Sequence, residues 1–144
     1  MNRLARLFSL AALLITSLVV LTFLAFNSRN FSYVVSDGKV TITGFSGSSD
    51  ELTIPSTLGG YPVTEIGKEA FKGCSSLTSV EIPASVTKIS SWAFFGCSSL
   101  TSVEIPEGVT KIDRSAFADC SALTSVEIPS SVTKISGWAF LGCS

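Results

Sequence analysis

The chain has 144 residues, of which 46% are hydrophobic and 15% are charged, and its formal net charge is −1. A near-neutral, slightly acidic chain lacks the basic surface that nucleic-acid binding requires. The chain contains no histidine, which excludes every catalytic or zinc site that depends on an imidazole. After an apolar N-terminal stretch, about 115 residues rich in Ser and Thr remain, enough for one domain.

The first element in chain order is apolar. Arg3 and Arg6 precede Leu7–Phe26, which runs for 20 residues without a charge. A helix of that length spans a bilayer, and the pattern also resembles the apolar core of an export signal. We expect residues 1–30 to be a signal peptide or a signal-anchor segment, and the membrane to be contacted only through residues 7–26. A buried core helix is the other interpretation.

A strong turn signal follows the apolar segment. Tyr33–Val35 and Lys39–Ile42 are runs of strand-forming residues that flank Asp37 and Gly38. An Asp-Gly pair between two such runs is typical of a tight β-hairpin. We predict that residues 31–51 form an N-terminal β-hairpin cap, which covers the open edge of the element that follows.

The rest of the chain is an internal repeat. Three copies with a 23-residue period begin at Leu77, Leu100 and Leu123, and the last stops one residue short, at Ser144. A divergent fourth copy precedes them. One copy cannot bury its own apolar side chains, whereas stacked copies can. We therefore predict a solenoid of four coils over residues 52–144, the last of them incomplete.

Each copy predicts two short strands and a tight turn. In the first full copy, Val80 and Ile82 point to one side of a strand that Pro83 ends. After a second strand, Ser90 is the expected N-cap of one helical or 3₁₀ turn, which Gly96 closes in a left-handed conformation. The side chains predicted to point inward are Leu77, Val80, Ile82, Val86, Ile89, Ala93, Phe94 and Cys97.

Stacking the copies predicts the fold class. The first strands, at residues 79–82, 102–105 and 125–128, should form one parallel sheet with coils about 4.8 Å apart. Identical residues then form ladders, of which the phenylalanine ladder is the spine. We expect a β-rich repeat solenoid with short helical or 3₁₀ turns, preceded by an apolar N-terminal helix.

The repeat pattern resembles a known family. Written as Leu-x-x-Val-x-Ile-Pro-x-x-Val-x-x-Ile-x-x-x-Ala-Phe-x-x-Cys, it is similar to the leucine-rich repeats of the BspA-like bacterial surface proteins over residues 52–144. The lead-in at residues 31–44 is also similar to the segment that opens such domains. The resemblance implies an exported, cell-surface or secreted protein that binds proteins or mediates adhesion to a host or another cell. It supplies no ligand.

The cysteines recur at the repeat interval, as Cys74, Cys97, Cys120 and Cys143. An even number in an exported chain would normally suggest disulfides. However, side chains stacked in register hold their Cβ atoms about 4.8 Å apart, outside the usual bridging range. We expect buried free thiols that pack as small hydrophobic side chains, and no zinc site.

Two rows of like charge follow the predicted strands. They are either solvated stripes that keep the protein soluble or, for the glutamate row, a site for a cation or a basic partner. No acid has a plausible second catalytic group and no serine has a base, so we expect no enzyme activity, no cofactor and no metal. The rows are Glu81, Glu104 and Glu127 on the first strand and Lys88, Lys111 and Lys134 on the second.

Two outer positions of the repeat vary in size from copy to copy. Either the large side chains lean over the small ones between them and shield each other, or they border a shallow apolar groove that could contact a ligand. The candidate contact residues are Trp92, Phe95, Trp138 and Leu141, and the small residues between them are Ser115 and Ala118.

The last coil has no capping element before Ser144, and we expect a truncated product or a partner that covers this end. The leading hypothesis is an extracellular, cell-surface or membrane-anchored binding module. The alternative is a non-catalytic assembly or cell-envelope scaffold that associates end to end through its uncapped C-terminal coil.

Overall fold

The computed structural model describes residues 28–144, and the predicted apolar N-terminal helix lies outside them. The chain divides into two units, residues 1–30 and residues 31–144, and the fold described here is that of the second. No helix in the described part of the chain is long and apolar enough to cross a membrane.

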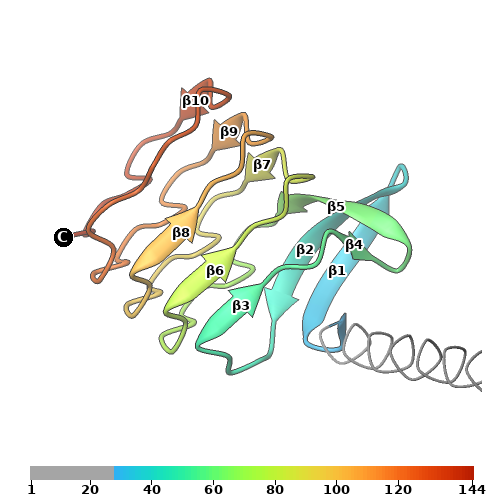
Figure 1. The fold of residues 1–144 in the computed structure, drawn as a ribbon, viewed down its shortest axis with the longest axis horizontal. Helices are drawn as coiled ribbons and strands as arrows, with labels where there is room; N and C mark the ends of the chain where they lie inside the picture. Colours follow the sequence, from blue (N-terminus) through green and yellow to red (C-terminus); the bar gives the residue numbers. More distant parts are fainter. Residues whose placement is uncertain (1–27) are drawn as a thin grey trace, which may run out of the picture. The chain divides into compact units, whose positions relative to one another are not determined.

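Residues 31–144 form a solenoid whose strands line up in two sheets (Figure 1). The long sheet has the order β1-β2-β5-β7-β9-β10, with β4 attached to β5, and the short sheet has the order β3-β6-β8. The long sheet contains β1 (Phe31–Ser36), β2 (Lys39–Phe45), β4 (Thr57–Leu58), β5 (Tyr61–Ile66), β7 (Lys88–Ile89), β9 (Lys111–Ile112) and β10 (Lys134–Ile135). The short sheet contains β3 (Glu51–Thr53), β6 (Ser79–Glu81) and β8 (Ser102–Glu104).

The predicted hairpin is present. β1 and β2 are antiparallel, and Asp37 and Gly38 between them have φ of 50° and 70°, as a tight hairpin turn requires. β2 then pairs in parallel with β5. The hairpin therefore covers the first coil along the long sheet, whereas β3 remains an edge strand of the short sheet.

Adjacent coils are in register at the 23-residue period. Val80 lies opposite Val103 in the short sheet, and Ile89 lies opposite Ile112 in the long sheet. All eight side chains predicted to point inward from the first full copy are buried. The alternation of apolar and polar residues in each short strand decides which face enters the core.

A run of β-turns takes the place of the helical turn that we expected. The N–H groups of Ala93, Phe95 and Cys97 donate to carbonyls three residues back. The intervening N–H groups donate to the next coil, from Trp92 to Arg114, from Phe94 to Ala116 and from Gly96 to Ala118. Trp92 has a φ of 58°, and a left-handed residue at this point interrupts any helix.

The phenylalanine ladder is the centre of the core. Successive rings are parallel within 4°, with centroids 5.0 Å apart for Phe71 and Phe94 and 5.1 Å apart for Phe94 and Phe117. At the N-terminal end, Phe31 and Phe45 from the hairpin pack on Phe71 at tilted angles. The hairpin thus closes the ladder as well as the edge of the long sheet.

The strand predicted at residues 125–128 is wrong. Within residues 28–144, no backbone hydrogen bond joins residues 124–128 to β8, although β10 of the same coil pairs with β9. This segment has a neighbour on one side only, and Glu127 would face Glu104 in a regular ladder, where like charges repel. As a result Ile128 is 39% exposed.

We predict that Phe94→Ala lowers the free energy of unfolding of residues 28–144 by about 3–5 kcal/mol, because the ring is completely buried between two others. Denaturant titration measures the change. The control is Leu141→Ala, which truncates a side chain that is 59% exposed and should change the free energy by less than about 0.5 kcal/mol. Similar small effects of both variants would contradict the ladder.

We also predict that amides of residues 124–128 exchange much faster with solvent deuterium than those of β6 and β8, because they lack ladder hydrogen bonds. Hydrogen exchange on monomeric residues 28–144 measures this. Equal protection of the three segments in a demonstrated monomer would show that the last coil is closed.

Candidate functional site

The exposed face of the short sheet is polar. Leu52, Val80 and Val103 point into the core, and between them the strands present serine, threonine and glutamate side chains to solvent. These side chains line an open hollow of about 440 Å³ that extends over all three strands. The outward residues are Glu51, Thr53, Ser79, Glu81, Ser102 and Glu104.

Within residues 28–144, the carboxylates on this face have no cationic partner. Thr53 Oγ1 donates a hydrogen bond of 3.1 Å to Glu81 Oε2. Among the described residues, the ion pairs involve only other acids, so Glu51, Glu81, Glu104 and the nearby Glu107 keep uncompensated charge. The face therefore carries a negative potential that attracts positively charged groups.

The predicted glutamate row is incomplete. Glu81 and Glu104 lie opposite each other in the short sheet, as expected. Glu127 is not in the ladder, because its segment has separated from β8, and a hollow of about 430 Å³ lies between the third and fourth coils there. Glu104, Glu107 and Glu127 surround that hollow together with proline and aliphatic side chains.

Two of the three lysines in the predicted row, Lys88 and Lys111, are ion-paired in the described part of the chain. Lys88 Nζ lies 2.9 Å from Glu65 Oε1 and 3.7 Å from Asp113 Oδ2, and Lys111 Nζ lies 3.4 Å from Asp113 Oδ1. The hydrogen bond to Glu65 raises the pKa of Lys88. Sequence reasoning missed this network because it considered the lysines only as a row of like charges. The signal was Glu65 at the lysine position of the preceding copy and Asp113 two positions beyond Lys111.

The aromatic positions are paired with cations from preceding coils. Lys68 Nζ lies 5.1 Å from the centre of the Trp92 ring, and Arg114 Cζ lies 4.1 Å from the centre of the Trp138 ring. Lys72 Nζ lies 5.9 Å from the Phe95 ring. Cations at these distances are attracted to aromatic faces. The repeat pattern alone did not indicate these basic partners of the aromatic residues.

The small residues between the aromatic side chains are covered. Ser115 is 6% exposed and Ala118 is 2% exposed, although both occupy outer positions of the repeat. This favours packing over the gap rather than an open groove. Trp138 and Leu141 are 57% and 59% exposed and present apolar surface to solvent. They remain candidate contact residues, whereas Trp92 and Phe95 are half-buried.

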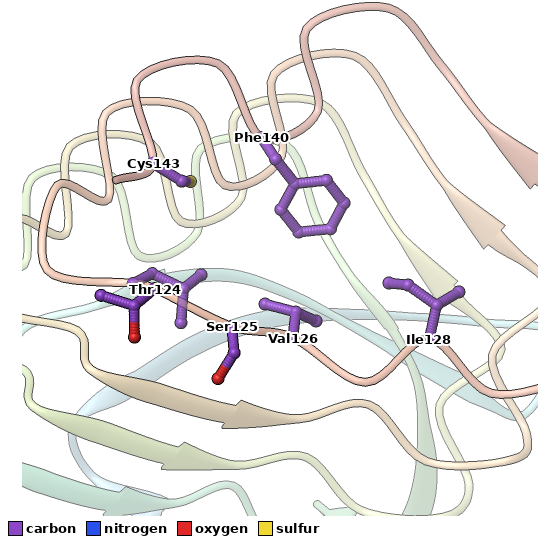
Figure 2. A pocket seen from close by; sticks show the side chains of 7 residues that line it. Thr124, Ser125, Val126, Ile128, Phe140 and Cys143 are labelled. Carbon is purple, nitrogen blue, oxygen red and sulfur yellow. The ribbon is translucent and has the colours of Figure 1, made fainter.

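The end face of the last coil is an open apolar pocket. Figure 2 shows Val126 and Ile128 pointing toward the Phe140 ring, while Ser125 points away. The pocket has a volume of about 250 Å³, and Leu123 also lines it. The inward side chains of this coil are thus packed on one side and accessible on the other.

The four cysteines are free thiols. The thiols of Cys97, Cys120 and Cys143 each donate to a phenylalanine carbonyl of the preceding coil, with sulfur–oxygen distances of 3.2 Å. The hydrogen bond with the Cys120 side chain, together with burial, raises the pKa of Cys97. Burial also raises the pKa of Cys74 and of Cys143. Within residues 28–144, no group of Cys, Asp and Glu side chains has the arrangement of a metal site.

Sequence comparison identifies the family. The model of the BspA type leucine-rich repeat region matches residues 40–144, with six copies. The chain therefore belongs to the BspA-type leucine-rich repeat family, as its repeat pattern suggested. No curated protein matches the chain.

Solved structures support the same assignment. A leucine-rich repeat protein of T. pallidum has 34% identity and a TM-score of 0.74, covering 76% of this chain and 52% of its own. One from Bacteroides ovatus has 34% identity and a TM-score of 0.72, with coverages of 79% and 32%. A leucine-rich cell surface protein of Faecalibacterium prausnitzii has 33% identity and a TM-score of 0.60, with coverages of 79% and 39%. The chain spans about half of the first relative and about a third of the second.

We predict that Cys97 and Cys120 resist thiol reagents in the native protein and react only after unfolding. Their thiols are completely buried and hydrogen-bonded to backbone carbonyls, so a reagent reaches them only when the coils separate. Mass spectrometry after timed alkylation measures this. The half-exposed Cys74 and Cys143 serve as internal controls and should react first. Rapid native labelling of all four, or a mass lower by two hydrogens per pair, would contradict the prediction.

Proposed function

We propose that this protein is an exported, non-catalytic binding module of the cell surface, which contacts a protein partner through the exposed face of its short sheet. Residues 1–30 direct export and, if retained, anchor the chain in the membrane. Residues 31–51 cap the solenoid, and residues 52–144 carry the binding surface. Membership of the family and the similarity to a cell surface protein support this assignment.

The unpaired carboxylates of the short sheet carry the proposal. On the long sheet, Lys88 and Lys111 are ion-paired. In contrast, Glu51, Glu81 and Glu104 face an open hollow with no cationic partner among the described residues. Serine and glutamate side chains repeat at matching positions in adjacent coils. Such a surface fits a partner with basic and hydrogen-bonding groups at a matching spacing, and electrostatic attraction accelerates the encounter.

No catalytic step is included in this function. The carboxylates of the short sheet face solvent in a row, and the chain has no histidine to act as a general base for its many serines. We include in the same proposal that binding of such a partner mediates adhesion to a host or to other cells.

We predict that Glu81→Gln with Glu104→Gln weakens retention of surface-biotinylated cell proteins on immobilised residues 28–144 by about tenfold, because two partly exposed charge pairs contribute about 1 kcal/mol or less each. Quantitative mass spectrometry of the retained proteins measures the change. The matched control is Asp37→Asn with Asp119→Asn, which removes the same charge from turns outside this face. Equal losses in both variants would indicate that only net charge matters.

A second candidate function is assembly through the end face of the last coil, which leaves Ile128 39% exposed and Ile135 48% exposed. In this scaffold a further repeat or a second chain covers the apolar pocket around Phe140. Sedimentation of residues 28–144 should then show mass increasing with concentration, and Ile128→Ser should reduce it. Leu141→Ser, on the turn edge of the same coil, is the control. A constant monomer mass would contradict assembly through this face.

A further inference from the structure

The N-terminal end of the solenoid carries an exposed apolar patch. It consists of Tyr33 and Val35, which share one face of β1, and Tyr61 on β5, and we call it the tyrosine patch. Their exposed fractions are 36%, 44% and 45%, respectively. Large apolar side chains that gather on one surface usually indicate a contact with a protein or a membrane.

The two tyrosines of the patch pack against glycine turns. A Cβ atom placed on Gly59 would lie 2.8 Å from the Tyr33 hydroxyl, and one placed on Gly38 would lie 3.9 Å from Tyr61 Cδ1. Tyr33 of β1 therefore lies against the turn that precedes β5, and Tyr61 of β5 lies against the turn that follows β1. The two rings and the hairpin belong to one continuous surface.

The patch lies on an unprotected sheet edge. β1 pairs with β2 only, so its outer backbone groups have no strand beside them. Exposed edge strands normally carry charged side chains or proline that discourage pairing. β1 instead presents valine and tyrosine, with a single acid and a single lysine at the turn beyond it.

The length of chain before β1 limits what can cover this edge. The apolar run Leu7–Phe26 ends four residues before Phe31. Four residues span at most about 14 Å when fully extended. If the apolar run is inserted in a bilayer, as the proposed function has it, β1 begins within that distance of the membrane surface.

We propose that the tyrosine patch rests on the membrane interface, so that the membrane contacts the solenoid as well as the anchor. This inference depends on the anchor in the proposed function. Tyrosine is enriched at the level of the lipid headgroups, where its ring is apolar and its hydroxyl stays hydrated. The unpaired backbone groups of β1 would lie among the polar headgroups there, which offer hydrogen-bond partners that the hydrocarbon core lacks.

Because the linker is short, a small patch is sufficient to dock the solenoid on the membrane. Four residues hold the patch at a high effective concentration near the surface, so weak docking becomes stable without further contacts. Docking at β1 would fix the N-terminal end of the solenoid at the membrane and leave the face of the short sheet free for a partner.

The full chain reconstituted in phosphatidylcholine vesicles tests this by hydrogen exchange of β1. Inserting a 20-residue Gly-Ser segment after Asn30 leaves the solenoid unchanged but lowers the effective concentration of the patch. We expect amides of Phe31–Ser36 to exchange about tenfold faster in the extended chain. Replacing Tyr33, Val35 and Tyr61 by serine should have the same effect, whereas Trp138→Ser with Leu141→Ser should leave β1 exchange unchanged.

Equal exchange of β1 in the native and extended chains would overturn the inference. Protection that depends on the protein-to-lipid ratio would do so as well, because it would mean that β1 pairs with a second copy. Carbonate extraction of the vesicles separates this failure from that of the anchor. A chain that is extracted has no inserted segment, so the anchor and the inference both fail. A chain that remains in the vesicles while the amides of β1 exchange freely contradicts the inference but not the anchor.

Discussion

The structure depends on adjacent coils lying one hydrogen bond apart along the run of β-turns that carries the phenylalanines. Phe94 donates to Ala116 of the next coil, and Phe117 donates to Ala139 in the same way. This spacing sets the rings 5.0–5.4 Å apart in parallel planes. An insertion or deletion within the run of β-turns would break both the backbone bonds and the stack. Extra residues elsewhere are tolerated, since the first coil is offset by 28 residues where Thr78 bonds to Asp50 and still keeps its register.

The spacing between coils also divides the residues into inward positions that hold the fold together and outward positions that are free to bind. Inward positions must match from coil to coil, whereas outward positions can differ, and the chain uses them in three ways. Lys88 and Lys111 of the long sheet pair with nearby acids, and basic residues pair with aromatic rings. The glutamates of the short sheet have no cationic partner among the described residues. The unpaired set is therefore the surface on which a partner can gain most from electrostatic attraction.

Periodicity predicted most of the fold because burial follows it. It placed the inward residues, the hairpin and the left-handed Gly96 correctly. It missed the positive φ at Trp92, since nothing in a tryptophan signals a left-handed conformation that backbone bonds to the next coil impose. It also missed the pairing of Lys88 with Asp113, which requires the register between coils, and it predicted a last strand that one-sided packing does not sustain.

A double-mutant cycle on the phenylalanine ladder tests the central claim most directly. Phe94→Leu and Phe117→Leu, alone and together, should show a coupling of about 0.5–1.5 kcal/mol in the free energy of unfolding, because the rings stack. Phe71→Leu with Phe117→Leu, whose rings are separated by Phe94, should be additive within about 0.5 kcal/mol. Equal coupling in both pairs, or none in either, would contradict a solenoid held together by contacts between adjacent coils.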